Sequence, residues 1–406
     1  MKKYIIWVLV SLISIATLAY LLIINETPTP IIEETIIASV DEEIIEEEPK
    51  EEVKVYDTDL YHSKLIDVAR DNDVYGMQVV VFKDEEILDS FNYGYSDIKT
   101  KEEVNDDTVF RIASTSKMIS NILIMKLVDE GKISLDSNLK EVTGLNYNEN
   151  VKLYHVLTHT SGIKDNPIFN ENLEKVYDID YLLEISSIDE PGTKYTYTNF
   201  GAGTMAAIIE KLTGEYFMDY AQRELFDKLD LNGAYVCEYL DEGSTIAKMY
   251  MDNYVFDPVT WFYDYDFYRS FELGKQYRLA YGNMYINCTG LAKLGMLLAG
   301  DGSVNGEKIL SEEALKEIRT IYDKAEGYPY MMGLNTDYSV TLVHGRNMYG
   351  HTGSAYNAIS CLMYDPSDHT GVALLTNHSI NHKNNLGYSD VIYDTVNLAY
   401  DNFFKD

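Results

Sequence analysis

Hydrophobic and polar positions follow different rhythms in different parts of the chain. Residues 78–83 and 86–95 alternate or run β-branched and aromatic, and Asp84-Glu85 between them is typical of a hairpin turn. Towards the other end, strand-like composition returns at residues 339–343, 358–364 and 371–376. A helical pattern follows at residues 389–403. Between the two ends the apolar spacing is mostly helical, at residues 117–130, 151–157, 181–185, 203–212, 218–229, 289–298 and 311–321. The pattern predicts an α+β fold, in which both chain ends build one antiparallel sheet flanked by helices and a mainly helical lobe is inserted.

The first residues have a different character. An uncharged apolar run of 21 residues extends from Tyr4 to Ile24, directly after Lys2 and Lys3. This length matches the ~20 residues that cross a bilayer as a helix, and lysines before it favour a cytoplasmic N-terminus. A cleaved signal peptide is the alternative, although its apolar part usually has ~7–15 residues. We expect one transmembrane helix within residues 1–25, which makes this a single-pass protein of the cell membrane with an extracytoplasmic body.

An acidic segment follows the apolar run. Residues 26–57 start with a Thr-Pro-Thr-Pro sequence and contain twelve acids and two lysines. Such a composition is typical of a solvated linker, although recurring Ile pairs leave a short amphipathic helix open. The expected organisation is therefore an anchor at 1–25, a linker at 26–57 and one folded domain at 58–406.

The composition excludes several classes of protein. The chain has 406 residues, 46% of them hydrophobic and 12% aromatic, which is enough to bury a large core. Its formal charge of −33 makes nucleic acid a poor partner, because nucleic-acid binding depends on Lys and Arg neutralising phosphates. Cys237, Cys288 and Cys361 are too few and too scattered for a disulfide scaffold or a four-cysteine zinc site. Their redox state stays open.

One serine and one lysine have the spacing of a nucleophile and its base. Ser114 and Lys117 stand at i and i+3, which share one face of a helix, so the amine can reach the hydroxyl. The same spacing recurs at Ser96, Ser137 and Ser161. Ser114 differs because it opens a long apolar helix, whose free N–H groups favour a developing anion.

Two further motifs carry groups that can act on a carbonyl. Tyr197-Thr198-Asn199 follows a Pro-Gly turn, and a tyrosine hydroxyl can shuttle a proton while an Asn amide holds a carbonyl. His351-Thr352-Gly353 follows the expected strand at 339–343. A second His-Thr-Gly begins at His369 and has the pattern of a plain hairpin turn. Each motif is weak by itself.

The order of the motifs resembles the serine β-lactamase and penicillin-binding-protein superfamily. It comprises Ser114–Lys117, the Leu157-Thr158-His159-Thr160-Ser161-Gly162 stretch, the turn before Asn199 and His351–Gly353. The resemblance is closest to the class C β-lactamase-like branch, which includes D,D-carboxypeptidases, D-amino-acid peptidases and esterases. It covers about residues 60–404 and implies a β-lactamase/transpeptidase-like fold.

The resemblance also implies a role for each motif residue. Ser114 would be the acylated nucleophile, Lys117 its base, and Tyr197 the group that passes protons to the leaving group and from water. Asn199 would grip the acyl side of the substrate, next to the strand residues His351, Thr352 and Gly353. The backbone N–H groups of Ser114 and Ser354 would form the oxyanion hole. This scheme needs no metal and no cofactor.

One departure from the family pattern bears on the substrate. Many β-lactamases and transpeptidases have Lys-Thr-Gly where this chain has His351, and histidine is largely neutral at pH 7 unless perturbed. This favours a D,D-carboxypeptidase, penicillin-binding-protein-like or D-Ala esterase activity on cell-wall material over a β-lactamase proper. A binding module with the same fold and no turnover is the remaining alternative.

Other clusters have a plainer interpretation. His155 with His159, and His378 with His382, have i, i+4 spacing, but no His-Glu-x-x-His pattern accompanies them, so no metal is expected. The aromatic block at residues 249–285 fits neither period, and we expect it to pack in the helical lobe.

Overall fold

The structure, a computed structural model, describes residues 56–171, 177–251, 254–256, 265–324 and 331–405. These residues belong to one unit of the chain, Val55–Asp406. The expected anchor at 1–25 and the linker as far as residue 55 lie outside the described residues. Among the helices that are described, none is long and apolar enough to span a bilayer.

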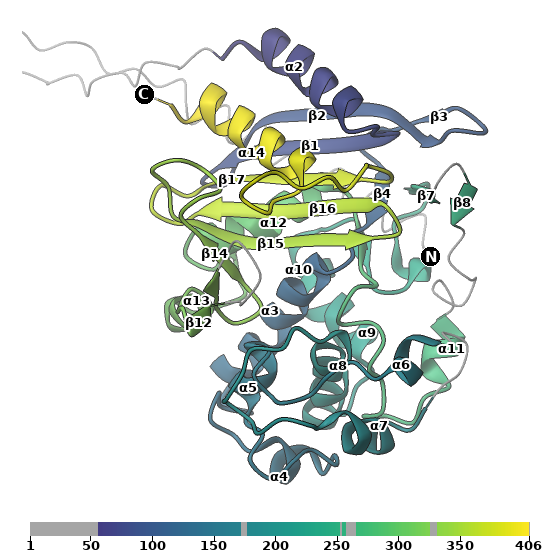
Figure 1. Cartoon of the computed structure of the whole chain (residues 1–406), viewed down its shortest axis with the longest axis vertical. Helices are drawn as coiled ribbons and strands as arrows, with labels where there is room; N and C mark the ends of the chain where they lie inside the picture. Colours follow the sequence, from purple (N-terminus) through teal and green to yellow (C-terminus); the bar gives the residue numbers. More distant parts are fainter. Residues whose placement is uncertain (1–55, 172–176, 252–253, 257–264, 325–330, 406) are drawn as a thin grey trace, which may run out of the picture. The chain divides into compact units, whose positions relative to one another are not determined.

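The main sheet draws its strands from both ends of the described chain, which confirms the predicted α+β architecture (Figure 1). Its described strands pair antiparallel in the order β12-β13-β14-β15-β16-β17-β1-β2-β3. The strands are β1 (Gly76–Lys83), β2 (Glu86–Asp97), β3 (Glu102–Glu103), β12 (Asp323–Lys324), β13 (Met331–Met332), β14 (Asp337–Ser339), β15 (Met348–Ala355), β16 (Ala358–Asp365) and β17 (Thr370–Thr376). The pairing of β1 with β17, from Met77↔Thr376 to Lys83↔Thr370, joins the two ends.

Both faces of this sheet are buried, and side-chain alternation along β1 assigns each residue to one of them. Val79 and Val81 belong to the hydrophobic cluster formed with helices α2 (Thr58–Asp71) and α14 (Asp390–Phe403). Val80 and Phe82 belong to the opposite cluster, which includes α12 (Cys288–Ala299). The sheet is therefore the middle layer between α2 and α14 on one face and α12 on the other (Figure 1).

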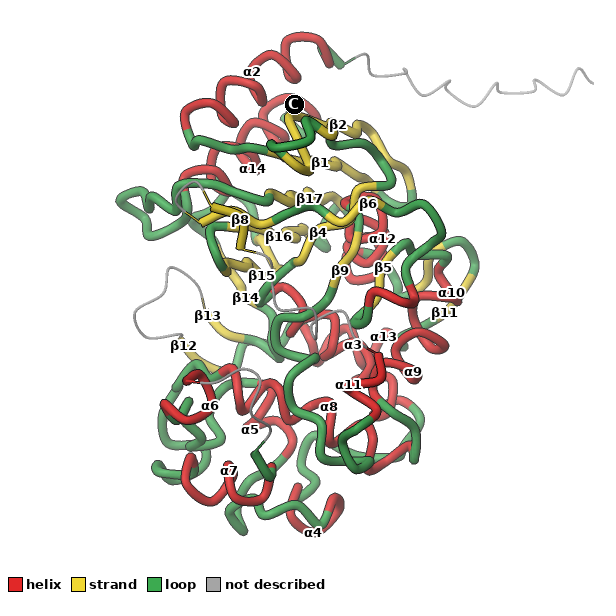
Figure 2. Tube along the Cα trace, turned by 90° about the vertical axis from the view of Figure 1, so that its right-hand side faces the viewer, coloured by secondary structure: helices red, strands yellow, loops and turns green. Residues whose placement is uncertain are grey.

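The helical lobe is inserted between two short strands that pair with each other. Phe110 of β4 (Thr108–Arg111) lies opposite Ile286 of β9 (Tyr285–Ile286), so the residues between them leave and rejoin the body at one place. Figure 2 shows these helices gathered on the side away from β1 and β2. They are α3 (Thr115–Asp129), α4 (Leu139–Thr143), α5 (Leu153–Leu157), α6 (Pro167–Glu171), α7 (Ile179–Ser186), α8 (Asn199–Thr213), α9 (Phe217–Ala221), the π-helix η1 (Gln222–Phe226), α10 (Asp227–Leu229), the 3-10 helix η2 (Cys237–Tyr239) and α11 (Tyr265–Arg269).

Minor elements complete the described part. The remaining helix, α13 (Glu312–Ile318), precedes the last strands of the sheet. The small strands are β5 (Gly233–Ala234), β6 (Thr245–Ile246), β7 (Met249–Met251), β8 (Tyr254–Phe256), β10 (Ser303–Val304) and β11 (Glu307–Lys308).

Several short elements, such as α4, α6, α11 and β4, were not predicted, and three further differences concern the sheet and the first described helix. The strand expected at 339–343 ends at Ser339, because the Ser339 hydroxyl accepts from the backbone N–H groups of Thr341 and Leu342, each at 3.1 Å, and closes a turn. The motif of His351 lies inside strand β15 and not after a strand. Helix α2 was not predicted at all, although Asp57 caps it by accepting from Leu60 N at 3.0 Å.

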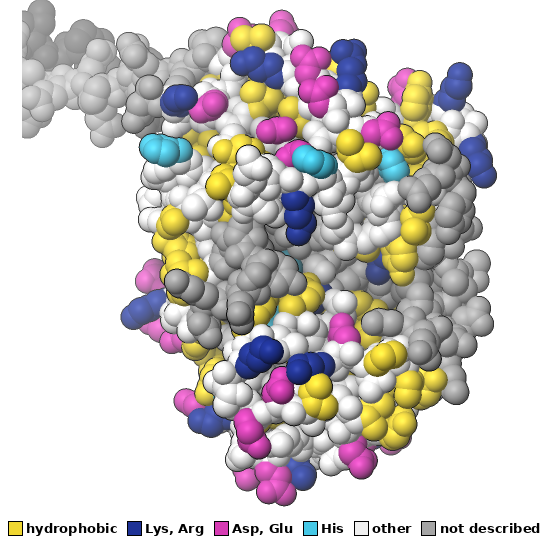
Figure 3. Space-filling view, viewed as in Figure 1, with side chains coloured by type: hydrophobic (Ala, Val, Ile, Leu, Met, Phe, Trp, Pro, Cys, Tyr) yellow, Lys and Arg dark blue, Asp and Glu magenta, His cyan; other side chains and the backbone are white. Residues whose placement is uncertain are grey.

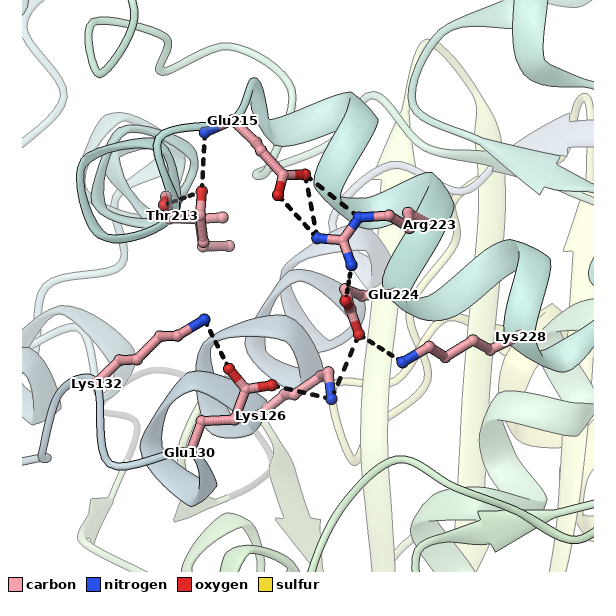
Figure 4. Close-up of polar contacts among 9 residues, drawn as sticks. Lys126, Glu130, Lys132, Thr213, Glu215, Arg223, Glu224 and Lys228 are labelled. Carbon is pink, nitrogen blue, oxygen red and sulfur yellow. Dashed lines mark hydrogen bonds and ion pairs between the residues drawn. The ribbon is translucent and has the colours of Figure 1, made fainter.

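Helix α3 is held at its C-terminal end by a network of ion pairs (Figure 4). Lys126 on α3 pairs with Glu130 at 3.1 Å and with Glu224 of η1 at 3.4 Å. Glu224 is 8% exposed and also pairs with Arg223 and, at 2.7 Å, with Lys228. Burial alone would raise the pKa of the Glu224 carboxyl, but its three cationic partners hold it below the ordinary value. The network therefore ties the helix that carries Ser114 and Lys117 to the neighbouring helices.

We predict that Glu224→Gln destabilises the fold by roughly 1–3 kcal/mol at pH 7, because three cations lose their shared charge partner. A carboxyl whose folded pKa is lowered contributes stability above its unfolded pKa and loses it as the pH falls. The difference between variant and wild type should therefore shrink below about pH 4.5. Denaturant unfolding at pH 7 and pH 4 measures this, with exposed Glu184→Gln as the control. Equal stability of Glu224→Gln and wild type at pH 7 would contradict the prediction.

Candidate functional site

The serine of the first motif lies at a strained connection between β4 and α3. Ala113, directly before it, has φ of +46°, a left-handed conformation that a residue with a Cβ rarely adopts. Ser114 takes the N-cap position of α3, yet its side chain caps no backbone N–H. The Ser360 hydroxyl on β16 donates to Ile112 O at 2.7 Å and fixes the connection to the sheet. The strained loop thus holds the Ser114 hydroxyl at the end of a buried helix.

Lys117 lies one turn further along α3 and is fully buried. Its amine donates to three oxygens: Ser114 Oγ at 3.1 Å, Asn199 Oδ1 at 2.9 Å and the Tyr281 carbonyl at 2.8 Å. An ammonium group has three hydrogens to donate, so the three contacts satisfy the charged form. When the amine is neutral, its lone pair can accept the proton of Ser114.

Burial lowers the pKa of Lys117 from 10.5 to about 7. This value is the net result of burial, which the Arg111 cation reinforces, and of the Asp165 and Asp337 carboxyls, which raise the pKa. At this value a large fraction of the amine is neutral near pH 7. This geometry and this pKa would allow Lys117 to take up a proton from Ser114.

The second motif lies beside the same amine. The Tyr197 ring centroid is 4.9 Å from Lys117 Nζ, and the His159 ring packs on Tyr197 at 4.6 Å between centroids. Asn199 begins helix α8, and its side-chain oxygen is the one that accepts from Lys117. Thr198 Oγ1 caps the helix by accepting from Gly201 N at 3.1 Å. The structure therefore brings the predicted serine, lysine and tyrosine together.

A pocket of about 190 Å³ opens above Ser114. Its lining unites most of the predicted site with the start of α14, and the lining residues are Ser114, Tyr197, His351, Thr352, Gly353, Ser354, Ile359, Asn381, Lys383, Gly387, Tyr388, Ser389 and Ile392. Figure 3 shows that this face of the molecule is hollowed between the sheet above and the helical lobe below. Lys117 and Asn199 are not part of the lining: Lys117 is fully buried next to Ser114, whereas Asn199 is partly exposed.

Gly353 allows β15 to approach the serine loop. A Cβ at this position would lie 2.4 Å from Ile112 O, 2.4 Å from Ser360 Oγ and 3.0 Å from Thr115 Oγ1. Any side chain would therefore push the strand away from Ser114, which explains the glycine of the third motif in physical terms.

His351 is 2% exposed and carries no charge at neutral pH. Burial, together with the nearby Lys117 cation, lowers its pKa to about 3. Its Nδ1 donates to the Thr352 carbonyl at 2.6 Å, so Nε2 is the unprotonated, accepting nitrogen. His351 is thus a neutral imidazole in the pocket wall, where a lysine would have placed a cation.

Two supporting residues were missed by sequence reasoning. Asp165 accepts from Thr198 Oγ1, Asn199 N and Phe200 N at the start of α8. His159 accepts from Thr198 N at 3.4 Å through Nδ1, so it supports the turn of Tyr197. His159 belongs to the stretch from Leu157 to Gly162 that carried the resemblance without an assigned role, whereas Asp165 lies three residues beyond it.

The other candidate clusters serve the fold. Ser96, Ser137 and Ser161 hydrogen-bond backbone groups and do not contact the lysines that follow them. His155 accepts from Lys152 N, His378 bonds to the Tyr250 carbonyl, and His382 pairs with Asp390. In the described ranges no three His, Cys, Asp or Glu side chains gather as a metal ion would need. The described aromatic residues of the 249–285 block, such as Tyr268, Phe271 and Tyr277, pack in the core as expected.

Comparison with known proteins identifies related sequences and folds. The profile of the family described as Beta-lactamase matches residues 59–395. N-acetylmuramyl-L-alanine amidase of Bacillus subtilis (strain 168) is 29% identical over 181 residues, which cover 38% of this chain and 41% of that protein. The chain thus matches well under half the length of this curated relative.

Solved structures share the fold over a longer span. The octameric penicillin-binding protein homologue from Pyrococcus abyssi aligns with a TM-score of 0.64 and 22% identity, over 79% of this chain and 74% of that one. D-amino acid amidase from Ochrobactrum anthropi SV3, complexed with L-phenylalanine, aligns with a TM-score of 0.67 and 20% identity, over 85% and 97%.

We predict that the reaction of Ser114 with an activated ester or a fluorophosphonate accelerates as the pH rises through about 7, because Lys117 must lose its proton first. Lys117→Arg should slow the reaction by at least ~10³-fold, since a guanidinium stays protonated. Lys140→Arg changes a lysine of another Ser-x-x-Lys spacing and is the matched control. A rate that rises only above pH 9 would contradict the assignment.

Proposed function

Because the chain belongs to the beta-lactamase family and its fold and relatives are those of serine hydrolases, we propose that it cleaves amide or ester bonds through an acyl-enzyme on Ser114. The observation that carries this proposal is the 3.1 Å contact between Lys117 Nζ and Ser114 Oγ, made by a buried amine directly behind an open pocket.

The proposed reaction has two halves. Ser114 Oγ attacks the carbonyl carbon while its proton passes to neutral Lys117, and the tetrahedral oxyanion is held by the N–H groups of Ser114 and Ser354. Each such donor contributes roughly 2.7–4 kcal/mol to the transition state. Tyr197 delivers a proton to the departing amine or alcohol, and the carbon–leaving-group bond breaks to give the acyl-serine. Water then attacks the ester, gives up its proton through the same groups and releases the acid.

The size of the pocket supports a proposal for the substrate class. We propose a D-alanyl peptide or D-alanyl ester of cell-wall material as the substrate, with D,D-carboxypeptidase or penicillin-binding-protein-like activity in the first case. The pocket of about 190 Å³ is smaller than the ~300–1,000 Å³ of drug-sized ligand sites, which suits a leaving group as small as one alanine. The side-chain amide of Asn199 is the group proposed to grip the acyl side.

The proposal includes a location. The apolar run within residues 1–25, with Lys2 and Lys3 before it, supports a single-pass anchor that leaves the hydrolase domain extracytoplasmic, linked by residues 26–57. From there the domain reaches cell-wall peptides and esters, the substrates proposed above.

A labelling and turnover experiment tests the function. We expect a fluorophosphonate or fluorescent penicillin to modify Ser114, and modification that survives Ser114→Ala would sink the proposal. Turnover is then compared on a D-Ala-D-Ala peptide, a D-Ala ester, a p-nitrophenyl ester and nitrocefin. Fast nitrocefin hydrolysis would show a β-lactamase proper. A burst without steady turnover would show a binding module that is acylated once.

The pocket wall yields a second prediction, about substrate charge. Among the described residues that line the pocket, Lys383 is the sole Lys or Arg, and it lies beyond Asn381, whose Nδ2 donates to Ser354 Oγ at 3.1 Å. An exposed cation there favours a leaving group with a free carboxylate. We expect Lys383→Gln to raise KM about 10-fold for a D-Ala-D-Ala peptide and less than about 2-fold for its C-terminal amide. An equal change in KM for the two substrates would show that Lys383 does not recognise the carboxylate.

A further inference from the structure

A single carboxylate organises the turn that presents the second motif. Asp165 Oδ1 accepts from Thr198 Oγ1 at 2.7 Å and from Phe200 N at 2.8 Å, and Oδ2 accepts from Asn199 N at 3.1 Å. All three partners are donors, so both oxygens act as acceptors, which is the pattern of an ionised carboxylate. Asp165 is half-buried and stands at the N-terminus of the 15-residue helix α8, where a negative charge is favoured.

The carboxylate of Asp165 is connected to Lys117 through a single residue, Asn199. Asn199 donates its backbone N–H to Asp165 and accepts from Lys117 Nζ at 2.9 Å through its side chain. Tyr197 directly precedes Thr198, the N-cap residue of α8. The centroid of the Tyr197 ring is 4.9 Å from Lys117 Nζ. A shift of Asp165 would therefore move both the phenol and the amide relative to Lys117.

Charge is the second contribution of Asp165. The groups that act on Lys117 from the surrounding elements are the carboxyls of Asp165 and Asp337, the cation of Arg111, the imidazoles of His159 and His351, and the rings of Tyr197 and Tyr281. Burial raises the pKa of Asp337 well above the usual range, which disfavours its charged form. Burial keeps His351 and His159 uncharged, because it lowers the pKa of each. Of the two carboxyls, Asp165 raises the pKa of Lys117 more than Asp337 does, and it is the one hydrogen-bonded to Thr198 and Asn199.

We propose that Asp165 is a positioning residue of the site: its carboxylate fixes Tyr197 and Asn199 against Lys117 and stabilises the protonated form of that base. The inference rests on the proposed function, because it gives Lys117 the role of base for Ser114.

The experiment measures the rate of Ser114 labelling by a fluorophosphonate between pH 5 and 10 in the full-length chain. Labelling needs only the nucleophile and its base, so it reads out Asp165 even if no substrate is turned over. Three variants separate charge from geometry. Asp165→Asn removes the charge and at least one acceptor. Thr198→Val removes one hydrogen bond to Asp165 and the cap on Gly201 N, and it keeps the charge. Asp178→Asn removes the carboxylate that caps α7.

We expect Asp165→Asn to lower the limiting rate about 10-fold or more and to move the midpoint of the rate–pH curve to lower pH by at least ~0.5 pH unit, because an anion beside the base is lost. Thr198→Val should lower the rate several-fold with an unchanged midpoint, and Asp178→Asn should change neither. A midpoint for Asp165→Asn that equals the wild-type value or lies above it overturns the proposal, as does an unchanged rate. Circular dichroism and a thermal melt confirm that each variant is folded.

The failure of the proposed function gives a different result. If the label lies on a residue other than Ser114 in the wild-type protein, the acyl-enzyme assignment fails whatever the Asp165 variants do. If Ser114 is labelled and the Asp165→Asn midpoint stays in place, only the inference about Asp165 fails.

Discussion

The dehydration of one amine is the constraint on which this site depends. Lys117 is fully buried, and moving an ammonium group out of water costs several kcal/mol unless its hydrogens find acceptors. The fold supplies three, from the serine on the same helix, the asparagine at the start of α8 and a backbone carbonyl at Tyr281. Since two of these acceptors, Asn199 and Tyr281, come from distant stretches of chain, the amine is fully accommodated only when the helical lobe is assembled.

Strands β15 and β16 of the sheet supply the remaining part of the site. Ser360 on β16 fixes the loop before Ser114, and β15 brings Gly353 and Ser354 alongside the nucleophile. The close approach requires a glycine at 353, and the tight turn into α3 forces Ala113 into a left-handed conformation. Strain and close packing of this kind are typical of functional sites, where surrounding structure holds unfavourable geometry in place. The ion pairs of Glu224 connect the opposite end of α3 to its neighbours.

Periodicity predicted the architecture and many of the longer elements, because strands such as β1 and β16 and helices such as α12 have strong hydrophobic patterns. It failed where local chemistry decides. The Ser339 hydroxyl closes a turn inside an apolar run. Strand β15 lacks a recognisable strand pattern in the sequence, because it contains two glycines and a histidine. Helix α2 has a polar exposed face, and no helix was predicted there.

The order of motifs predicted Ser114, Lys117 and Tyr197 as a group, and in the structure both Ser114 and the Tyr197 ring contact the amine of Lys117. Sequence alone could not show that Asn199 faces Lys117 or that Asp165 holds the turn, because both facts depend on how α8 packs against α3. The neutral state of His351 also follows from burial, which a reference pKa does not include.

The most direct measurement is an NMR titration of the Lys117 side chain in protein labelled with ¹³C at lysine Cε, with the resonance assigned by its absence in Lys117→Arg. The account predicts a titration midpoint near pH 7, which means that a substantial share of the amine is unprotonated where the enzyme would work. A midpoint above pH 9.5 would show a permanently charged lysine and would contradict its role as the base of Ser114.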